Sequence, residues 1–293
     1  MNEKMLEIMK SQKGFIAALD QSGGSSAKTL RLYGIEEDSY NGEDEMFDLI
    51  HEMRTRVMKS KEFTSEKIVG VILFEQTMNR KIDDKYTSDY LWDKNILSFL
   101  KVDKGLAELN NGVQLMKDIP NLEDTLKVAV ERGIFGTKMR SVIKEANEKG
   151  IKEIVKQQFD IAKTIASFGL VPIIEPEVDI NAEDKEKCEE LLKKQVMEEL
   201  SKLSEDTKVM FKFTIPTVDN YYEDVINDKH VVKVVALSGG YERVDACNRL
   251  SRNKGMIASF SRALLEGLKV SDTDEEFDKK LAESIDLIYK ASI

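Results

Sequence analysis

The chain has 293 residues, of which 41% are hydrophobic and 33% charged, so it can bury a substantial core and is not expected to be disordered. Its formal net charge of −10 disfavours nucleic-acid binding, which normally needs a net basic face to neutralise phosphates. No apolar run approaches the roughly 18 residues that a membrane span needs. We therefore expect neither a nucleic acid nor a membrane as a partner.

The two cysteines and two histidines also restrict the chemistry. Cys188 and Cys247 do not form a C-x-x-C pair, and the first residues lack the apolar run of a signal peptide, so we expect a cytoplasmic protein. His51 and His230 are too few for a three-histidine zinc site. We expect no metal and no other cofactor, although a site made of carboxylates alone stays open.

Short apolar or β-branched runs alternate along the chain with amphipathic, charge-rich stretches. The runs predict eight strands, at 14–20, 68–76, 97–102, 135–140, 170–176, 209–215, 231–238 and 257–262. The stretches predict helices at 106–132, 145–168, 184–204 and 241–254, with extra helix and loop in 21–65 and a final helix in 271–290. Such alternation is typical of a parallel sheet.

No linker rich in Pro, Gly or Ser divides these elements, so the sequence predicts one domain over residues 1–293. An open, doubly wound sheet is the structural alternative. Eight strands spread over the whole length, with polar groups at the carboxyl ends of so many, favour closure into a (β/α)8 TIM barrel. The active site of such a barrel lies at the carboxyl ends of its strands.

Charged residues interrupt several of the predicted apolar strands. They are Asp20, Lys101, Lys138, Glu175 and Lys212, with Arg140 and Arg262 at strand ends. In a parallel barrel these side chains converge at one mouth and form a cationic pocket that also holds carboxylates. This arrangement predicts a small phosphorylated molecule as the substrate.

Lys212 and Glu175 are the strongest catalytic candidates. Lys212 lies in Val-Met-Phe-Lys-Phe-Thr-Ile, an apolar setting that disfavours the charged ammonium, and a neutral amine can attack a ketone. Glu177 follows Glu175 on the same face of its strand, and such a pair suits proton transfer. Alternatively, Lys212 extends to solvent or pairs with a carboxylate, and Glu175 only neutralises a neighbouring lysine.

Two small-residue loops are candidates for phosphate binding. The first follows Asp20 and contains Ser22, Ser25 and Lys28, a weak signal because most such clusters are plain turns. The second is more specific, because loops after strands seven and eight of such barrels commonly bind phosphate. It comprises Ser238, Gly239, Gly240 and Arg262. The alternative interpretation is that these residues form only a tight turn and a surface arginine.

Seven of these segments, in this order along the chain, resemble class I fructose-bisphosphate aldolases. They are Ala18-Leu19-Asp20, Lys101-Val102-Asp103-Lys104-Gly105, Thr137-Lys138-Met139-Arg140, Pro172-Ile173-Ile174-Glu175-Pro176-Glu177, Lys212, Leu237-Ser238-Gly239-Gly240 and Ser259-Phe260-Ser261-Arg262. The resemblance implies cleavage of fructose 1,6-bisphosphate to dihydroxyacetone phosphate and glyceraldehyde 3-phosphate through a Schiff base on Lys212.

The resemblance also implies roles for the other site residues. Glu175 would be the general acid and base, with Glu177 completing the carboxylate pair. Asp20 would orient the substrate, and Lys138 would supply positive charge beside the Schiff base. Substrate contacts are implied for Lys101 and Arg140, one phosphate site for Ser238, Gly239, Gly240 and Arg262, and the other for Ser22, Ser25 and Lys28.

The chain departs from the animal enzymes at three places. Thr29 replaces an arginine, Met139 replaces a tryptophan, and the chain ends at Ile293 without a long tail that carries a terminal tyrosine. It therefore resembles the shorter bacterial form. Two other functions stay open: a different Schiff-base lyase, acting on a monophosphate or a 2-keto acid, and a catalytically silent barrel that binds a partner. Homo-oligomerisation is also left open.

Overall fold

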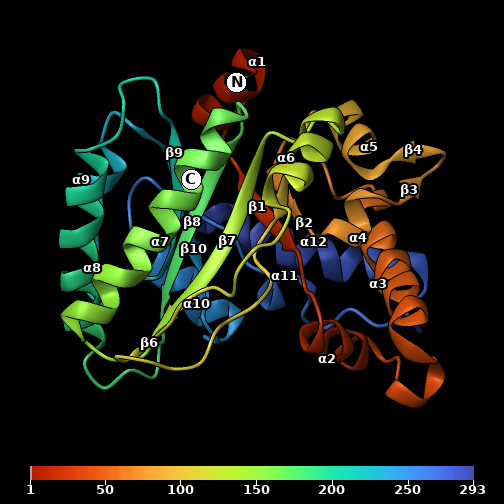
Figure 1. Ribbon diagram of the computed structural model, residues 1–293. Helices are drawn as coiled ribbons and strands as arrows, with labels where there is room; N and C mark the ends of the chain where they lie inside the picture. The colour runs from red at the N-terminus through yellow and green to blue at the C-terminus, as the bar shows by residue number, and fades with distance from the viewer. Residues whose placement is uncertain (1) are drawn as a thin grey trace.

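The computed structural model describes residues 2–293, and its frame is a ring of eight parallel strands surrounded by helices (Figure 1). The strands are β1 (Phe15–Leu19), β2 (Ile68–Leu73), β5 (Leu97–Lys101), β7 (Gly136–Ile143), β8 (Val171–Val178), β9 (Val209–Thr214), β10 (Val231–Leu237) and β11 (Met256–Ala258). Neighbouring strands pair in this same order. All eight overlap the predicted segments, so the predicted parallel sheet is confirmed.

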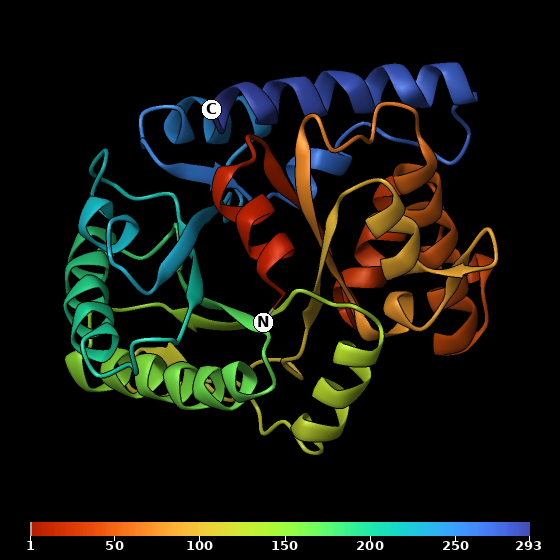
Figure 2. The same cartoon turned by 90° about the horizontal axis from the view of Figure 1, so that it is seen from above.

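The ring joins its first and last strands, as the predicted barrel requires. The backbone N–H of Ala18 in β1 donates to the carbonyl of Phe260, just after β11, at 3.2 Å. Seen from above in Figure 2, the strands surround a common centre, and the helices that follow β1 lie outside them. This is the (β/α)8 TIM barrel, and the open sheet is excluded.

The helices connect the strands and cover the outside of the ring. They are α2 (Gly24–Tyr33), η1 (Glu37–Ser39), α3 (Gly42–Lys59), α4 (Glu75–Met78), α5 (Thr87–Asp93), α6 (Leu122–Glu131), α7 (Glu148–Ser167), α8 (Lys185–Leu200), α9 (Glu223–Ile226), α10 (Arg243–Leu250), α11 (Arg262–Leu265) and α12 (Asp274–Ala291). The predicted helices in 145–168, 184–204, 241–254 and 271–290 are confirmed, as is extra helix in 21–65. Within the described residues, no helix has the length and apolar character to cross a membrane.

Two predicted boundaries are wrong. In the stretch 106–132 the helix begins only at Leu122, because the chain turns at Asn111 and Gly112, both with positive φ (50° and 71°). This turn leads into β6 (Val113–Gln114), which pairs antiparallel with β7. The last strand ends at Ala258, so Arg262 begins α11 instead of ending a strand.

The amino end of the barrel is closed by a helix that precedes the first strand. Met5 and Met9 of α1 (Glu3–Ser11) are buried in one cluster with barrel residues that include Ile16 and Phe99. Figure 2 shows α1 across the middle of the ring. Since apolar side chains fill this end, polar groups inside the barrel are confined to its other end, the carboxyl ends of the strands.

Candidate active site

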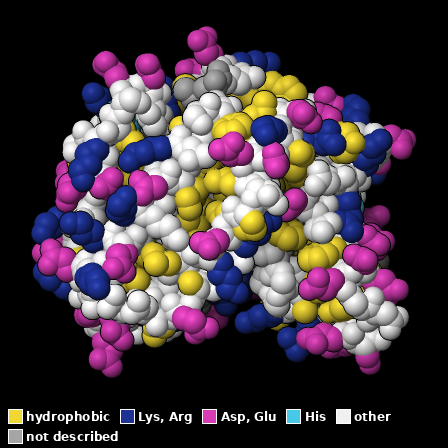
Figure 3. Space-filling model, viewed as in Figure 1, with side chains coloured by type: hydrophobic (Ala, Val, Ile, Leu, Met, Phe, Trp, Pro, Cys, Tyr) yellow, Lys and Arg dark blue, Asp and Glu magenta, His cyan; other side chains and the backbone are white. Residues whose placement is uncertain are grey.

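A cavity of about 580 Å³ lies at the carboxyl ends of the strands. All but one of the predicted site residues line it: Asp20, Ser22, Ser25, Lys28, Lys101, Lys138, Arg140, Glu175, Glu177, Lys212, Ser238, Gly239 and Arg262. In Figure 3 the molecular surface is notched at the end where α2 and α10 lie in Figure 1, and Lys and Arg side chains gather at the notch. Gly240, the exception, lines an adjoining cavity of about 320 Å³.

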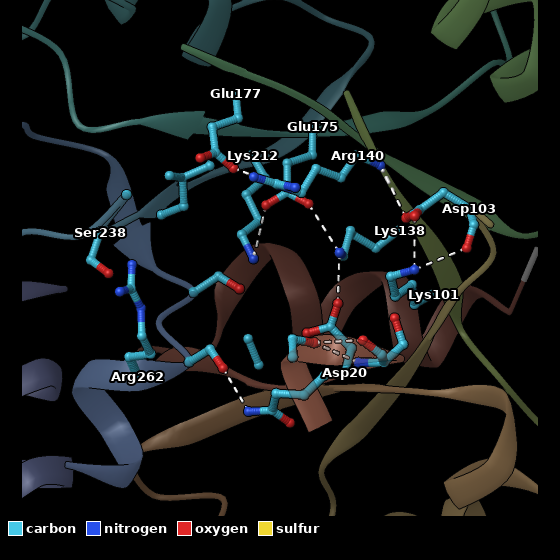
Figure 4. Close-up of a pocket in the computed structure, with 18 of the residues that line it drawn as sticks. Asp20, Lys101, Asp103, Lys138, Arg140, Glu175, Glu177, Lys212, Ser238 and Arg262 are labelled. Carbon is cyan, nitrogen blue, oxygen red and sulfur yellow. Dashed lines mark hydrogen bonds and ion pairs between the residues drawn. The ribbon is translucent and has the colours of Figure 1, made fainter. Parts of the chain in front are cut away.

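Glu175 stands between two buried lysines at the centre of the site (Figure 4). Its Oε1 lies 3.2 Å from Lys212 Nζ and its Oε2 lies 3.1 Å from Lys138 Nζ. The three side chains come from neighbouring strands of the barrel: Lys138 from β7, Glu175 from β8 and Lys212 from β9. One carboxylate therefore contacts both amines, and it lies close enough to Lys212 to exchange a proton with it.

Asp20 extends this chain of charges from the end of β1. Its Oδ2 lies 2.6 Å from Lys138 Nζ. Burial would raise the pKa of Asp20, but the charges of Lys138 and Lys212 outweigh it and hold the pKa well below its ordinary value. Burial likewise opposes the charge of Lys138, but Asp20 and Glu175 raise its pKa above the ordinary value. Lys138 is therefore a fixed cation and Asp20 a fixed anion at neutral pH.

The backbone of Glu175 is anchored from outside the barrel. Its N–H donates to Oε1 of Gln158 on α7 at 2.9 Å, and the amide of Gln158 donates to Ser141 Oγ on β7. Gln158 is fully buried. This buried amide links β7 to β8 and holds the backbone of Glu175 in place. Sequence analysis missed Gln158, which looks like an ordinary position on a helix.

A second charged group lies on β5, β7 and β8 and in the segment just after β5. Arg140 was predicted to end its strand, but it lies within β7, which continues to Ile143. Lys101 Nζ lies 2.7 Å from Asp103 Oδ1, and Arg140 Nε lies 2.6 Å from Glu177 Oε2. Asp103 also accepts from the backbone N–H groups of Arg140 and Gly105. Sequence analysis gave Asp103 no role, although it lies two residues after Lys101 in a segment that resembles the aldolases.

Ser238 and Arg262 lie on the other side of the site from Lys101 and Asp103 in Figure 4. Gly239 and Gly240, after β10, both have positive φ (62° and 122°). A Cβ on Gly240 would lie 3.4 Å from a terminal nitrogen of Arg262, so this backbone runs against the guanidinium. Backbone N–H groups and a guanidinium held together in this way can bind a phosphate.

The loop after β1 is less available for phosphate binding than its composition suggests. Ser25 Oγ donates to the carbonyl of Ser22 at 2.7 Å and accepts from the Ser22 N–H at 2.8 Å. The Ser25 hydroxyl therefore holds the first turn of α2 in place. Lys28 and Thr29 also line the cavity, whereas Met139 is buried in the outer core. Of these two departures from the animal enzymes, only Thr29 bears on the site.

Comparison with known proteins agrees with this geometry. The sequence model of a family described as fructose-bisphosphate aldolase class-I matches residues 1–220. A protein of Clostridium acetobutylicum named fructose-bisphosphate aldolase class 1 is 62% identical over 294 residues, covering 100% of both chains. The chain belongs to the class I fructose-bisphosphate aldolase family. The resemblance found in its seven segments is thus confirmed.

Solved structures show that this class I aldolase has its family's fold. A fructose-bisphosphate aldolase of Plasmodium falciparum, in complex with TRAP and a small-molecule inhibitor, superposes with a TM-score of 0.78. It is 19% identical, and the match covers 99% of this chain and 93% of that chain. An archaeal fructose-1,6-bisphosphate aldolase, with its catalytic lysine bound to the carbinolamine intermediate, gives a TM-score of 0.53 at 16% identity, covering 98% of each chain.

Proposed function

We propose that the chain cleaves fructose 1,6-bisphosphate reversibly to dihydroxyacetone phosphate and glyceraldehyde 3-phosphate, as an aldehyde-lyase of glycolysis and gluconeogenesis. Lys212 forms the Schiff base. The observation that carries the proposal is the position of Glu175, within 3.2 Å of Lys212 Nζ and 3.1 Å of Lys138 Nζ in the buried end of the cavity. A nucleophilic amine beside a carboxylate is the arrangement that imine formation needs.

Formation of the imine begins when the neutral amine of Lys212 attacks the ketone carbon. The resulting carbinolamine must lose its hydroxyl as water, and Glu175 supplies the proton for this step. Lys138 stays protonated beside the reaction because Asp20 and Glu175 raise its pKa. Its fixed charge lies beside the carboxylate that transfers the protons, 3.1 Å from Glu175 Oε2.

Cleavage uses the iminium ion as an electron sink. Glu175, now ionised, takes the proton of the hydroxyl on the carbon that becomes the aldehyde. The carbon–carbon bond breaks, its electron pair moves toward the iminium nitrogen, and the aldehyde leaves. Protonation of the enamine carbon and hydrolysis of the imine then release the ketone product and restore Lys212. Asp20 orients the substrate hydroxyls, and Glu177 supports Glu175 as the second carboxylate.

The remaining residues hold the substrate. Ser238, Gly239, Gly240 and Arg262 bind one phosphate. Lys28 supplies positive charge to the other, near Ser22 and Ser25, whose mutual hydrogen bonds hold the first turn of α2. Lys101 and Arg140 contribute positive charge between them. We further propose that residues 1–293 act as one domain in the cytoplasm, that the reaction needs no metal, and that a small phosphorylated sugar is the ligand of this site.

The proposal is tested by assaying cleavage with chelator present. Fructose 1,6-bisphosphate is the substrate, and a monophosphate and a 2-keto acid are offered in parallel as competing substrate classes. The expected result is release of dihydroxyacetone phosphate from the bisphosphate at an undiminished rate with chelator. Preference for a 2-keto acid, or loss of activity with chelator, would contradict the proposal.

A further inference from the structure

Arg54 on α3 is fully buried, yet it pairs with no carboxylate among the described residues at salt-bridge distance. Its guanidinium instead donates to neutral oxygens: Nη2 to the carbonyl and the side-chain Oε1 of Gln21, at 2.7 and 3.0 Å, and Nη1 to Thr77 Oγ1 at 2.6 Å. A buried unpaired charge is costly, so a purely structural purpose would be served better by an apolar residue.

The contacts of Arg54 fix which way the amide of Gln21 faces. A guanidinium is only a donor, so the atom of Gln21 that contacts it must be the carbonyl oxygen. The NH2 group of Gln21 therefore faces the other way, and it donates to Ser261 Oγ at 2.7 Å. This bond joins the loop after β1 to the segment after β11, across the place where the barrel closes.

The bond to Gln21 also determines what Ser261 can do. Since Ser261 Oγ accepts from Gln21, its hydroxyl proton is free to be donated elsewhere. No second partner of this hydroxyl occurs within residues 2–293. Ser261 and Gln21 both line the main cavity, and Ser261 directly precedes Arg262.

We propose that Arg54 is a positioning residue that acts through Gln21 to turn the Ser261 hydroxyl into the cavity, where it donates to the phosphate held by Arg262. The proposal rests on the proposed function in one respect, that a substrate phosphate binds beside Arg262. Burial lowers the pKa of Arg54 to about 9, with Asp20 opposing the shift, so the guanidinium stays charged and the amide orientation stays fixed at neutral pH.

A double-mutant cycle between Arg54→Met and Ser261→Ala separates this role from a structural one. The affinity for inorganic phosphate is measured by calorimetry, which needs no turnover. Only phosphate binding that is lost in Arg262→Met is assigned to the site beside Arg262. Each single variant should weaken this affinity roughly tenfold, the value of one hydrogen bond to a charged group. The double variant should be no weaker than either single variant, because both remove the same bond.

Two further variants keep the test clear if Arg54→Met folds poorly. Gln21→Met removes the residue through which Arg54 acts on Ser261, and it should weaken phosphate binding by the same factor. Arg56→Met, on the same helix, is the control, because Arg56 contacts Tyr33 and the segment 269–274 instead of Gln21. In the cleavage assay the positioning variants should raise KM for fructose 1,6-bisphosphate about tenfold and leave kcat within about twofold.

Unchanged phosphate affinity in Gln21→Met or Ser261→Ala would overturn the inference. Additive losses in the double variant would also overturn it, and so would a wild-type chain that binds no phosphate. Failure of the proposed function gives a different pattern: the wild-type chain then binds phosphate with the predicted dependence on Arg54 but does not cleave the bisphosphate.

Discussion

Lys212 Nζ lies 3.2 Å from Glu175 Oε1, and the two side chains are only 6% and 3% exposed. At this distance a proton can pass between carboxylate and amine without an intervening water molecule. The pair is buried in the cavity that Ser238 and Arg262 also line. In the proposed mechanism the amine therefore reacts away from bulk solvent, while Ser238 and Arg262 hold a phosphate of the substrate.

Replacing Lys212 should abolish turnover without unfolding the chain. In Lys212→Arg the charge beside Glu175 remains, but a guanidinium cannot form the imine. We expect kcat to fall on the order of 10⁴-fold or more. Lys233→Met is the matched control, a strand lysine of β10 that donates to the carbonyl of Lys10 and lies outside the cavity, and it should retain normal kcat. Residual activity near wild type in Lys212→Arg would exclude Lys212 as the nucleophile.

Glu175→Gln should impair proton transfer while leaving the shape of the site intact. We expect kcat to fall about 10²–10⁴-fold, the usual contribution of a general acid or base. Glu189→Gln serves as the control because Glu189 is a comparably buried carboxylate that pairs with Lys185, away from the cavity. That variant should lower the free energy of unfolding and leave kcat unchanged. Equal losses of kcat in the two variants would mean that Glu175 acts only through stability.

The pH dependence of stability should report the pair formed by Asp20 and Lys138. The pKa of Asp20 in the folded chain lies below its ordinary value of 3.8, so Asp20 contributes stability above that pH. This contribution is lost as the pH falls through the lower, folded-state pKa. Asp20→Asn should therefore lower the free energy of unfolding by about 3 kcal/mol at neutral pH. This is the lower end of the range for a broken buried ion pair, because Lys138 still pairs with Glu175 in the variant.

Urea unfolding between about pH 2 and pH 6 measures this effect. The difference in unfolding free energy between wild type and Asp20→Asn should shrink as the pH falls below 3.8. Asp160→Asn is a suitable control, since Asp160 also has a lowered pKa but lies half-exposed on α7, where solvent screens its pairing with Lys156. A difference for Asp20→Asn that does not vary with pH would contradict the assignment.

Arg262→Met should affect binding more than chemistry. Loss of a charged phosphate contact should raise KM for fructose 1,6-bisphosphate tenfold or more, roughly the value of one charge-assisted hydrogen bond, with a smaller change in kcat. Arg252→Met is the control, because Arg252 pairs with Asp219 outside the cavity. If kcat falls and KM is unchanged, Arg262 does not hold the phosphate.

Much of the fold and the lining of the site could be predicted from sequence, for a physical reason. Buried parallel strands need apolar residues at nearly every position, so a charged residue such as Lys212 stands out against its neighbours. The carboxyl ends of all barrel strands meet at one mouth, so the sequence alone predicts that those charged residues lie together.

Other features could not be predicted because they depend on contacts between distant segments. Gln158 and Arg54 lie on helices and look ordinary in sequence, yet each makes a buried hydrogen bond to the residues around the cavity. The error in 106–132 arose because its apolar spacing suits a helix, whereas the positive φ of Asn111 and Gly112 turns the chain instead. In that stretch the turn propensity of Asn111 and Gly112 outweighed the helical spacing of the apolar residues.

The most direct test of the account is borohydride reduction in the presence of dihydroxyacetone phosphate, followed by peptide mass mapping. We predict one reduced adduct, on Lys212, in the wild-type chain and none in Lys212→Arg. Lys138 should stay unmodified, since Asp20 and Glu175 keep its amine protonated. An adduct on Lys138 or another lysine, or the absence of any adduct from the wild-type chain, would contradict the Schiff-base mechanism at Lys212.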